Sequence, residues 1–414
     1  MSARIDTLII GAGQAGLALS YCLTQKALPH LILEQAEQPA ASWRDGRWDS
    51  FTLVTPNWQL RLPGAEYKGD APDAFLTRLE VIDYLEQYAA SFAAPICCGV
   101  RAKSIERSPN SFRIQTTGGE YTAANVVVAT GLFQQPKLPP FSVLLPSALA
   151  QLHSGQYRNP AELAPGAVLV VGSGQSGCQI AEELYQSGRQ VYLSVGSSSG
   201  RVPRRYRGQD SARWFQEMGF YDRTVDQLAS PRAKFAGNLH LSGKDGGHTL
   251  NLHQFARDGV TLLGRITGAQ DGAILLAADL YENLAKADKV EADLVKAIDD
   301  HIAKAGLVAP SESLPRLQDG FAAPLIRQLD LAASRITTVI WAMGYCFDFS
   351  WVGLPVLDED GFPRQQRGVT AIPGLYFLGL PWLHSAKSGL FLGIGADAEH
   401  IANHIAGRRS ENQV

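Results

Sequence analysis

The chain has few cysteines, and none of them forms a pair with redox spacing. Its five cysteines, Cys22, Cys97, Cys98, Cys178 and Cys346, include neither a C-x-x-C nor a C-x4-C pattern. This excludes the dithiol centre that a disulfide reductase needs, and we interpret all five as buried or half-buried free thiols. No Cys/His spacing indicates a structural metal, so we expect no metal site.

Long apolar runs and blocks of like charge are also absent. No uninterrupted apolar segment is long enough to span a bilayer. The apolar run Leu8–Ile10 leads into a glycine loop, as a strand does, and not into a signal-peptide cleavage site. The formal net charge is −3, with 19% charged residues, which argues against nucleic acid as a partner. We therefore expect a cytoplasmic protein that binds neither membranes nor nucleic acid.

Glycine, in contrast, recurs in two loops of the same pattern. Gly11–Gly16 has the sequence GAGQAG and Gly172–Gly177 has GSGQSG, and each follows a short strand-like apolar run. In such a loop the first glycine allows a tight turn and the second lets the backbone approach a pyrophosphate. The third lets helix and strand pack closely, with the phosphates at the helix N-terminus. Two such loops predict two dinucleotides, as in a flavoprotein that a nicotinamide cofactor reduces.

The residue that ends the second strand of each unit distinguishes the two cofactors. Leu31–Leu33 runs into Glu34, and a carboxylate in this place accepts hydrogen bonds from an adenosine ribose. The equivalent strand of the second unit ends in Ser194, and arginines follow at positions 201, 204, 205 and 207. A ribose 2′-phosphate is repelled by a carboxylate and attracted by serine and arginine. The pattern predicts FAD on the first loop and NADPH on the second, with a solvated surface loop as the alternative for the arginine-rich run.

The length of the chain and its element pattern predict an α/β protein with two Rossmann-like domains. We expect a discontinuous FAD-binding domain in residues 1–160 and 333–414. An NADPH-binding domain in 161–332 carries a helical insertion over about 205–332. The strand Thr338–Ala342 is expected to return the chain to the first domain.

Apolar spacing predicts further helices outside the two glycine-loop units. They cover Leu79–Phe92, Arg213–Met218, Val225–Leu228, Ala273–Gly306, a segment near Ala322–Ser334, and Gly393–Ile405. The insertion is either a lid or substrate wall, or an ordinary surface helical hairpin. Its aromatic group either lines a substrate cavity or forms the core of a small subdomain, which we favour; it comprises Tyr206, Trp214, Phe215, Phe220 and Tyr221.

Several motifs in sequence order resemble flavin-containing monooxygenases, the class B flavoprotein monooxygenases, and especially their compact bacterial and plant auxin-forming members. Besides the two loops these are Leu33–Gln35, Ala41–Arg44, Phe51–Asn57, Val126–Gly131, Leu152–Tyr157, Ala342–Tyr345 and Lys387–Leu390. The family fingerprint is only partly present, because His153 and Tyr157 keep its last spacing while its glycine is missing. We interpret His153 as fixing the linker between the domains and not as a proton donor.

The resemblance implies an NADPH- and FAD-dependent monooxygenase. NADPH would reduce the flavin, O2 would add at flavin C4a, and the (hydro)peroxide would oxygenate a small amine nitrogen, thioether sulfur or carbonyl. Because the cofactor carries most of this chemistry, we name one catalytic candidate, Asn57, in the position of the family's active-site asparagine. Its alternative role is to complete a turn after Pro56. The alternative function is an NADPH-dependent flavin reductase or oxidase that releases H2O2 without oxygenating a substrate.

The loops and the resemblance together give the predicted site. The predicted FAD-binding residues are Gly11, Gly13, Gln14, Ala15, Gly16, Glu34, Gln35, Ser42, Trp43, Val100 and Thr130. The predicted NADPH-binding residues are Gly172, Gly174, Gln175, Ser176, Gly177, Ser194, Arg204 and Arg205. O2 and a small-molecule substrate complete the expected partners. The oligomeric state is left open, with a homodimer as the default assembly.

Overall fold

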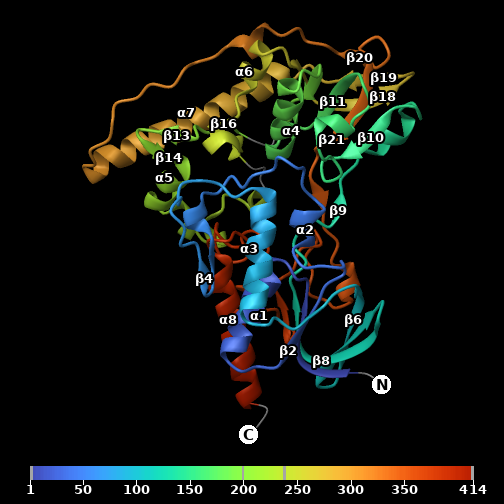
Figure 1. The fold of residues 1–414 in the computed structure, drawn as a ribbon, viewed down its shortest axis with the longest axis vertical. Coiled ribbons are helices and arrows are strands. Elements are labelled where there is room, and N and C mark those ends of the chain that lie inside the picture. The colour runs from blue at the N-terminus through green and yellow to red at the C-terminus, as the bar shows by residue number, and fades with distance from the viewer. Residues whose placement is uncertain (1–2, 198–199, 236–238, 412–414) are drawn as a thin grey trace.

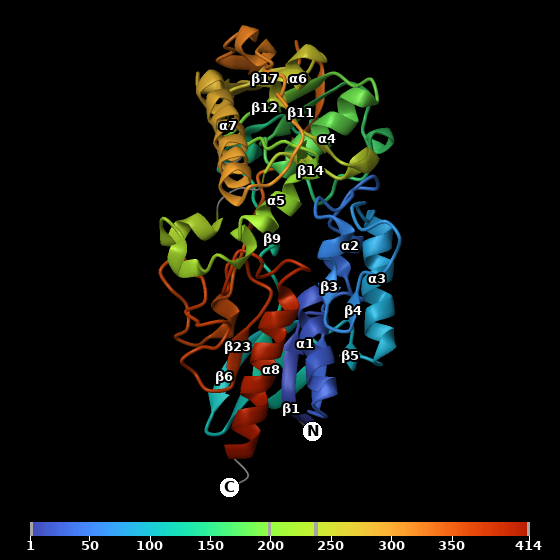
Figure 2. The ribbon, with the colours of Figure 1, turned by 90° about the vertical axis from the view of Figure 1, so that its left-hand side faces the viewer.

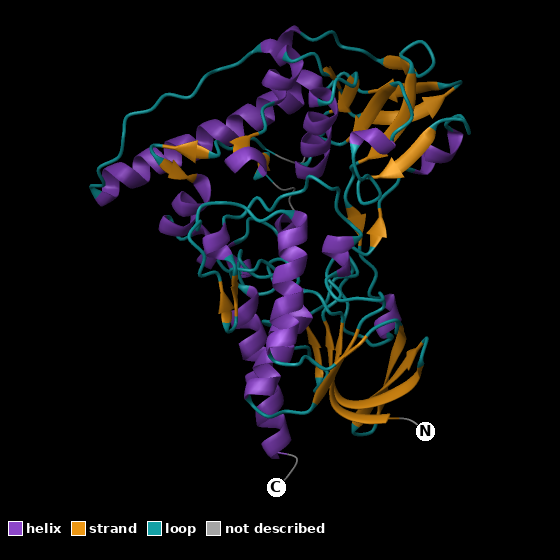
Figure 3. Cartoon of the chain, viewed as in Figure 1, coloured by secondary structure: helices purple, strands orange, loops and turns teal. Residues whose placement is uncertain are grey.

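The computed structural model describes residues 3–197, 200–235 and 239–411, and this part of the chain forms two lobes (Figure 1). The lower lobe in that view holds both ends of the chain and one large sheet, and the upper lobe holds a second sheet. Helices and strands contribute to both lobes (Figure 3), which confirms the predicted α/β class.

The lower lobe is built on a seven-stranded sheet of order β5-β2-β1-β8-β7-β6, with β23 also paired to β8. The pairs from β5 to β8 and the β8–β23 pair are parallel, and the β6–β7 and β7–β8 pairs are antiparallel. The strands are β1 Ala3–Ile10, β2 His30–Leu33, β5 Ile96–Cys97, β6 Ala102–Ser108, β7 Ser111–Thr116, β8 Gly119–Val128 and β23 Leu375–Phe377. The helices are α1 Gln14–Gln25, α2 Ala41–Arg44, α3 Arg78–Ser91 and α8 Ile394–Glu411, and a small hairpin joins β3 Arg61–Leu62 to β4 Ala65–Glu66.

Apolar residues in the central strands explain why this sheet lies inside the lobe. Leu8, Ile9 and Val126–Val128 are at most 1% exposed, as expected for parallel strands that are covered on both faces. Helices α1 and α8 pack side by side (Figures 1 and 3). The helices predicted over Leu79–Phe92 and Gly393–Ile405 are therefore confirmed as α3 and α8, although α8 continues to Glu411.

The upper lobe contains an all-parallel five-stranded sheet of order β10-β21-β11-β12-β17. The strands are β10 Ala150–His153, β11 Ala167–Val171, β12 Val191–Ser194, β17 Thr261–Leu263 and β21 Ile336–Trp341. Its helices are α4 Gln175–Gln186, α6 Leu252–Arg257 and α7 Leu280–Ala305, and β18 Ile266–Gln270, β19 Ala273–Leu276 and β20 Gln328–Asp330 form a separate antiparallel sheet. Each of the two large sheets therefore carries one of the two glycine loops.

The strand pairing shifts the limits of the upper lobe from those expected. Strand β10 lies within 1–160, and β21 lies within 333–414, yet both belong to the second sheet. The strand predicted to return the chain to the first domain, Thr338–Ala342, instead pairs with β10 and β11 in the middle of that sheet. Residues 338–341 are buried there, and nothing local in the sequence says which of the two sheets such a strand joins.

Two of the helix predictions in the insertion are wrong, one of them only in its first part. Ala273–Leu276 is a strand, and helix α7 begins only at Leu280. The segment near Ala322–Ser334 contains strand β20 and not a helix. A short apolar run fits the helical and the strand periodicity equally well. The two-residue turn Asp271-Gly272, whose φ angles are +50° and +77°, is typical of a β-hairpin and therefore indicates strands on both sides of it.

The chain crosses between the lobes twice, and the two crossings are paired. Strand β9 (Gln135–Pro136) runs up and β22 (Tyr345–Cys346) runs back, and they form an antiparallel ribbon. The Lys137 amide adds a hydrogen bond of 3.0 Å to the Gly344 carbonyl oxygen. In Figure 1, β9 lies between the two sheets.

A further segment of the upper half reaches down to the lower lobe. After β12 come two small hairpins, β13 Arg205–Tyr206 with β14 Gln209–Asp210 and β15 Leu241–Ser242 with β16 His248–Thr249, and helix α5, Ser211–Glu217. Residues 219–235 then contact the lower lobe, where Asp222 pairs with Lys387 and Arg232 with Asp360. Figure 2 shows this yellow-green segment beside the orange-red loops of the lower lobe.

Candidate active site

The first glycine loop has the backbone geometry that a pyrophosphate site needs. Gly11 has a φ of +111°, and a Cβ atom there would lie 2.7 Å from the Ala129 carbonyl oxygen. A Cβ on Gly16 would lie 1.9 Å from the Gly11 carbonyl oxygen, so α1 packs directly on the loop. Around Gly13, in contrast, no described atom lies within 4 Å of the Cβ position. Two glycines are thus required for packing, and the middle one faces open space.

The second loop repeats this geometry. Gly172 has a φ of +103° and faces the Ala342 carbonyl oxygen at 2.6 Å, and Gly177 faces the Gly172 carbonyl oxygen at 1.8 Å. Gly174 again has no described atom within 4 Å of its Cβ position. Helices α1 and α4 begin within these loops, directly after Gly13 and Gly174, without a side-chain cap or an acidic residue in the first turn. Both helix N-termini are therefore suited to bind phosphate.

The glutamine at the fourth position of each loop is directed at a neighbouring segment. Gln14 Nε2 donates to the Gly389 carbonyl oxygen at 2.5 Å, and Gln175 Nε2 donates to the Leu239 carbonyl oxygen at 3.5 Å. Ala15 is buried and Ser176 is half-buried. The two glutamine side chains thus hold nearby loops against the two helix N-termini.

Glu34 lies where the prediction places it, at the end of β2 beside the first loop. Its side chain is buried, and its carboxylate accepts hydrogen bonds from the amides of Ala12 at 2.8 Å and Ala36 at 3.0 Å. The backbone of Val100 joins the same place, because its amide donates to the Glu34 carbonyl oxygen at 2.9 Å. Gln35 is exposed. The carboxylate is thus fixed next to the glycine loop.

Ser194 ends β12 in the equivalent place of the upper lobe. Its hydroxyl is buried and donates to the Gly264 carbonyl oxygen at 3.0 Å. Arg201 is also buried and pairs with Asp288 and Glu291 at 2.8 Å each. The serine is positioned as predicted, while this arginine is bound within the protein.

Arg204 and Arg205, the predicted 2′-phosphate ligands, lie in different surroundings. The Arg204 guanidinium donates to both carboxylate oxygens of Asp210 at 2.6 Å and to the Val54 carbonyl oxygen at 2.8 Å, and it lies 4.5 Å from the centre of the Phe75 ring. This geometry is at odds with a phosphate contact, because the donors are already used where the lobes meet. Arg205 in β13 is exposed. Its guanidinium donates to the carbonyl oxygens of Gly246 and Gly247, in the turn between β15 and β16.

Asn57 begins a single 3-10 turn, η1 (Asn57–Gln59), and its side chain is 3% exposed. Its Nδ2 donates to the Ala71 carbonyl oxygen at 3.0 Å, so the remaining oxygen, Oδ1, must be an acceptor. That atom is buried without a hydrogen-bond partner among the described residues, as are Trp58 Nε1 and Gln59 Oε1. An unpaired buried polar atom costs about 1–3 kcal/mol. Because three of them lie on one turn, this turn is a candidate ligand-binding surface.

Of the remaining predicted flavin contacts, Ser42 and Trp43 belong to α2, and Thr130 follows β8. The Ala40 amide donates to the Ala12 carbonyl oxygen at 3.2 Å, which places the start of α2 beside the first loop. The Trp43 ring stacks on Phe391 with centres 6.0 Å apart and an angle of 25°. Ser42 and Thr130 are exposed. Trp43 is half-buried, and the Arg47 guanidinium lies over its ring, 5.3 Å from the ring centre.

Comparison with known proteins bears on the identity of the chain. The pyridine nucleotide-disulphide oxidoreductase family profile matches residues 8–206. A CzcO-like oxidoreductase of Geobacillus kaustophilus is 36% identical over 403 residues, covering 97% of this chain and 98% of that protein. The indole-3-pyruvate monooxygenase YUCCA1 of Oryza sativa is 29% identical over 200 residues, which cover 48% of this chain and 49% of that protein. The chain belongs to the same family as the CzcO-like oxidoreductases, and it is similar to flavin-containing monooxygenases.

Solved structures show the same fold. A flavin-containing monooxygenase from Stenotrophomonas maltophilia superposes with a TM-score of 0.66 at 19% identity, covering 98% of this chain and 99% of that one. OTEMO in complex with FAD and NADP superposes with a TM-score of 0.59 at 14% identity, covering 100% of this chain and 87% of that one. The two-domain dinucleotide-binding plan predicted for this oxidoreductase is therefore confirmed.

His153, at the end of β10, contacts the returning crossing beside β22, where its ring lies 4.6 Å from that of Tyr345. Its Nδ1 accepts from the Gly155 amide at 3.1 Å, so Nε2 carries the proton and donates to the Gly344 carbonyl oxygen at 2.9 Å. Burial lowers the pKa of the imidazole, which favours the neutral form. This geometry supports the linker role and not proton transfer.

The aromatic group of the insertion divides into two parts. Tyr206 and Trp214 pack with Ile298 and Ile302 of α7 in a small core, as favoured from the sequence. Phe215, Phe220 and Tyr221 instead form a ring cluster that reaches the lower lobe, where the Tyr221 hydroxyl lies 2.9 Å from Gln59 Nε2. Sequence reasoning missed this contact, because the two residues are 162 positions apart.

The N-terminus of α8 is a further part of the site that spacing did not reveal. The Ser388 hydroxyl donates to the buried Asp397 carboxylate at 2.6 Å and accepts from the amides of His384 and Ser385 at 3.1 Å. The bond from Gln14 to Gly389 ties this turn to the start of α1. The family motif Lys387–Leu390 thus lies beside the first glycine loop.

The described residues also bear on the expectations for disulfides, metal sites and membrane spans. All five cysteines are free, as expected, but Cys346 is exposed and not buried or half-buried as predicted. The described residues contain no group of three or more histidine, cysteine and acidic side chains that could hold a metal. Among the helices of the described ranges, none is long and apolar enough to cross a membrane. The roles assigned to individual site residues stay predictions.

Proposed function

We propose that this protein is an NADPH- and FAD-dependent monooxygenase that oxygenates a small soft nucleophile, an amine nitrogen or thioether sulfur, or a carbonyl by way of a C4a-(hydro)peroxyflavin. The observation that carries the proposal is the buried, unpaired Oδ1 of Asn57 on a turn next to the contact between the lobes. A flavin reductase would need the two glycine loops but no such unpaired polar turn. The cytoplasmic location and a homodimeric assembly stay predictions.

Two sets of residues fit the two cofactors. The loop Gly11–Gly16 with the fixed carboxylate of Glu34 suits FAD, because the carboxylate can accept hydrogen bonds from the ribose hydroxyls of FAD. The loop Gly172–Gly177 with the exposed Arg205 suits NADPH, and Ser194 leaves the end of β12 without a carboxylate that would repel a 2′-phosphate. When bound, FAD accepts a hydride from NADPH and activates O2. The protein supplies binding, orientation and exclusion of water.

Asn57 has two groups with which to serve this chemistry. Its amide nitrogen has two hydrogens, and only one is used by Ala71. The second can stabilise negative charge that develops on oxygen next to the flavin. The unpaired Oδ1 can accept a hydrogen bond from a ribose hydroxyl of the nicotinamide cofactor. Asn57 therefore holds a donor and an acceptor in fixed positions on the same turn.

Stopped-flow absorbance on the purified holoenzyme tests the proposal. The protein is reduced anaerobically with NADPH and mixed with O2, first alone and then with candidate amines, thioethers and ketones. A transient spectrum distinct from oxidised flavin, or oxygenated product formed in proportion to NADPH consumed, is the expected result. Immediate return to oxidised flavin with stoichiometric H2O2, with every substrate class present, would instead establish a reductase or oxidase.

A further inference from the structure

Residues 219–235, the strap, follow helix α5 of the upper half and contact the turn that carries Asn57. The Tyr221 hydroxyl accepts a hydrogen bond of 2.9 Å from Gln59 Nε2. Both side chains are buried, at 7% and 1% exposed. Because Asn57 and Gln59 share the 3-10 turn η1, the bond from Gln59 to Tyr221 fixes the strap to the turn that carries the catalytic candidate.

The strap also pairs with the loop that precedes α8. The Val225 amide donates to the His384 carbonyl oxygen at 3.1 Å, and the Ala386 amide donates to the Arg223 carbonyl oxygen at 2.9 Å. This loop continues into the Ser388 turn, which is tied to the start of α1 beside the first glycine loop. The strap therefore contacts both parts of the candidate site in the lower lobe, and Figure 2 shows it beside the loops of that lobe.

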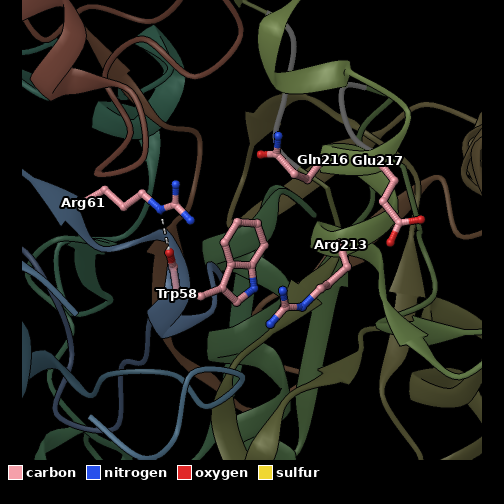
Figure 4. A pocket seen from close by; sticks show the side chains of 5 residues that line it. All are labelled: Trp58, Arg61, Arg213, Gln216 and Glu217. Atoms are coloured by element: carbon pink, nitrogen blue, oxygen red, sulfur yellow. Dashed lines mark hydrogen bonds between the residues drawn. The ribbon is translucent and has the colours of Figure 1, made fainter. Parts of the chain in front are cut away.

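Pockets on both sides of the strap show that its contact with the lower lobe is loosely packed. A pocket of about 260 Å³ lies where helix α5 faces the Asn57 turn (Figure 4). It is lined by Trp58, Arg61, Arg213, Gln216 and Glu217. A second pocket, of about 180 Å³, lies between Asp222 of the strap and the start of α8 with the loop before it. Close-packed interiors contain few voids larger than a water molecule, so the strap touches the lower lobe at separate points and not along a continuous face.

The strap is further held by exposed ion pairs. Asp222 pairs with Lys387 and Arg232 with Asp360, and the Asp222 and Arg232 side chains are 58% and 78% exposed. Ion pairs of this kind contribute little to stability and are screened by salt. Within the described ranges, no strap side chain belongs to an apolar core. A segment with exposed polar contacts and few buried apolar ones opens at low cost in free energy.

We infer that the strap is a lid on the candidate site, with Tyr221 as the positioning residue that holds the Asn57 turn when the lid is closed. The lid undocks from the lower lobe to let a small molecule reach the flavin, and it docks to exclude water. That the excluded water protects an oxygenation rests on the proposed function. Because the strap follows α5 and its contacts lie on the lower lobe, closing also couples the approach of the two lobes to the arrangement of the catalytic turn.

Limited trypsin cleavage of the oxidised, FAD-loaded protein measures the opening without any turnover. Cleavage is followed at Lys234, whose side chain is 12% exposed, so that trypsin needs the strap to open. The T224C/S385C variant locks the lid, because these residues are antiparallel partners and such partners have Cα atoms about 4.5–5.5 Å apart, within the reach of a disulfide. The single variants T224C and S385C are the controls.

The oxidised double variant is expected to be cleaved at Lys234 at least about tenfold more slowly than the same protein after reduction, since cleavage follows the population of the open form. The single variants should be insensitive to reduction. In the wild type, raising the salt concentration from about 0.01 M to about 1 M should speed cleavage, because it screens the exposed ion pairs. Equal cleavage of the oxidised and reduced double variant would overturn the inference.

A second variant tests whether the strap covers the flavin. Iodide quenching of flavin fluorescence in the oxidised protein reports the access of solvent, and Y221F should raise both quenching and Lys234 cleavage by about threefold to tenfold, the factor that one hydrogen bond contributes to an equilibrium. Y206F is the matched control, because the Tyr206 hydroxyl is also buried but bonds to Asp299 of α7. Equal behaviour of Y221F and Y206F, or faster cleavage without more quenching, would show that the strap is no lid.

The lid and the proposed function can fail separately. If the cross-link slows cleavage and Y221F raises quenching while the oxygen reaction gives only H2O2 with every substrate class, the lid stands and the proposed monooxygenase function fails. If substrates are oxygenated equally fast, and with equal H2O2 release, by the oxidised and the reduced double variant, the proposed function stands and the lid inference is wrong.

Discussion

Replacing Arg204 by alanine is expected to destabilise the protein far more than the same change at Arg205. The Arg204 and Asp210 side chains are only 3% and 6% exposed, and two contacts of 2.6 Å join them. Removing the arginine leaves a buried carboxylate and the Val54 carbonyl oxygen without their donor. Breaking a buried ion pair from one side costs about 3–5 kcal/mol. Arg205, which is exposed and bonded to carbonyl oxygens alone, should cost about 1 kcal/mol or less.

Urea unfolding of both variants, followed by intrinsic and flavin fluorescence, measures the difference. The double variant R204M/D210N provides the sharper test, because it removes the stranded charge while asparagine still caps α5 through the bond to the Ala212 amide. It should recover a large part of the stability that R204A loses. Equal free energies of unfolding for R204A and R205A would refute the view that Arg204 fastens the lobes together.

The other predictions concern the first glycine loop, the catalytic turn and one titrating pair. Gly13→Ala should fold normally, since its Cβ meets no described atom, but it should lose FAD because the added methyl group occupies the place of the pyrophosphate. Gly16→Ala should fail to fold, since its Cβ would lie 1.9 Å from a carbonyl oxygen. Circular dichroism and flavin content of the purified variants distinguish the two, and full flavin content in Gly13→Ala would contradict the loop assignment. Asn57→Leu should leave anaerobic flavin reduction by NADPH within about twofold of wild type while H2O2 release rises toward the NADPH consumed; if reduction itself collapsed, Asn57 would belong to hydride delivery. His248 hydrogen-bonds to the buried Glu182 carboxylate, which raises the pKa of the imidazole, so the stability it contributes is complete below about pH 6.5 and is lost as pH rises through the raised pKa. His248→Gln should remove that part of the pH dependence of the urea midpoint, and an unchanged profile would show that the pair contributes nothing.

Local patterns in the sequence were sufficient for the cofactor loops. The turn at Gly11, the contact of Gly16 with the loop and the carboxylate of Glu34 are all set within one strand–helix–strand unit. The same holds for the second loop, because it repeats the unit. Features set by residues close in sequence could therefore be predicted.

Features set by distant residues could not be predicted. Arg204 was interpreted as a phosphate ligand from its neighbours in sequence, but Val54, which accepts its hydrogen bond, is 150 positions away. Strand β21 could have joined either sheet, since an apolar parallel strand satisfies both. The pocket at Trp58 needs α5 from another part of the chain. Each of these depends on tertiary packing that no window of sequence contains.

The paired crossings β9 and β22 have a consequence for how the protein can be divided. Because Pro136 is the register partner of Tyr345, the upper lobe leaves and rejoins the lower lobe at neighbouring points. Residues 137–344 are thus a single cassette, inserted as one continuous segment into the lower lobe. The sheet of the lower lobe gains its last strand, β23, without any residue of that segment. A short linker from Pro136 to Tyr345 can excise the whole cassette in one step. Cutting at either crossing alone would still leave the halves attached through the other strand.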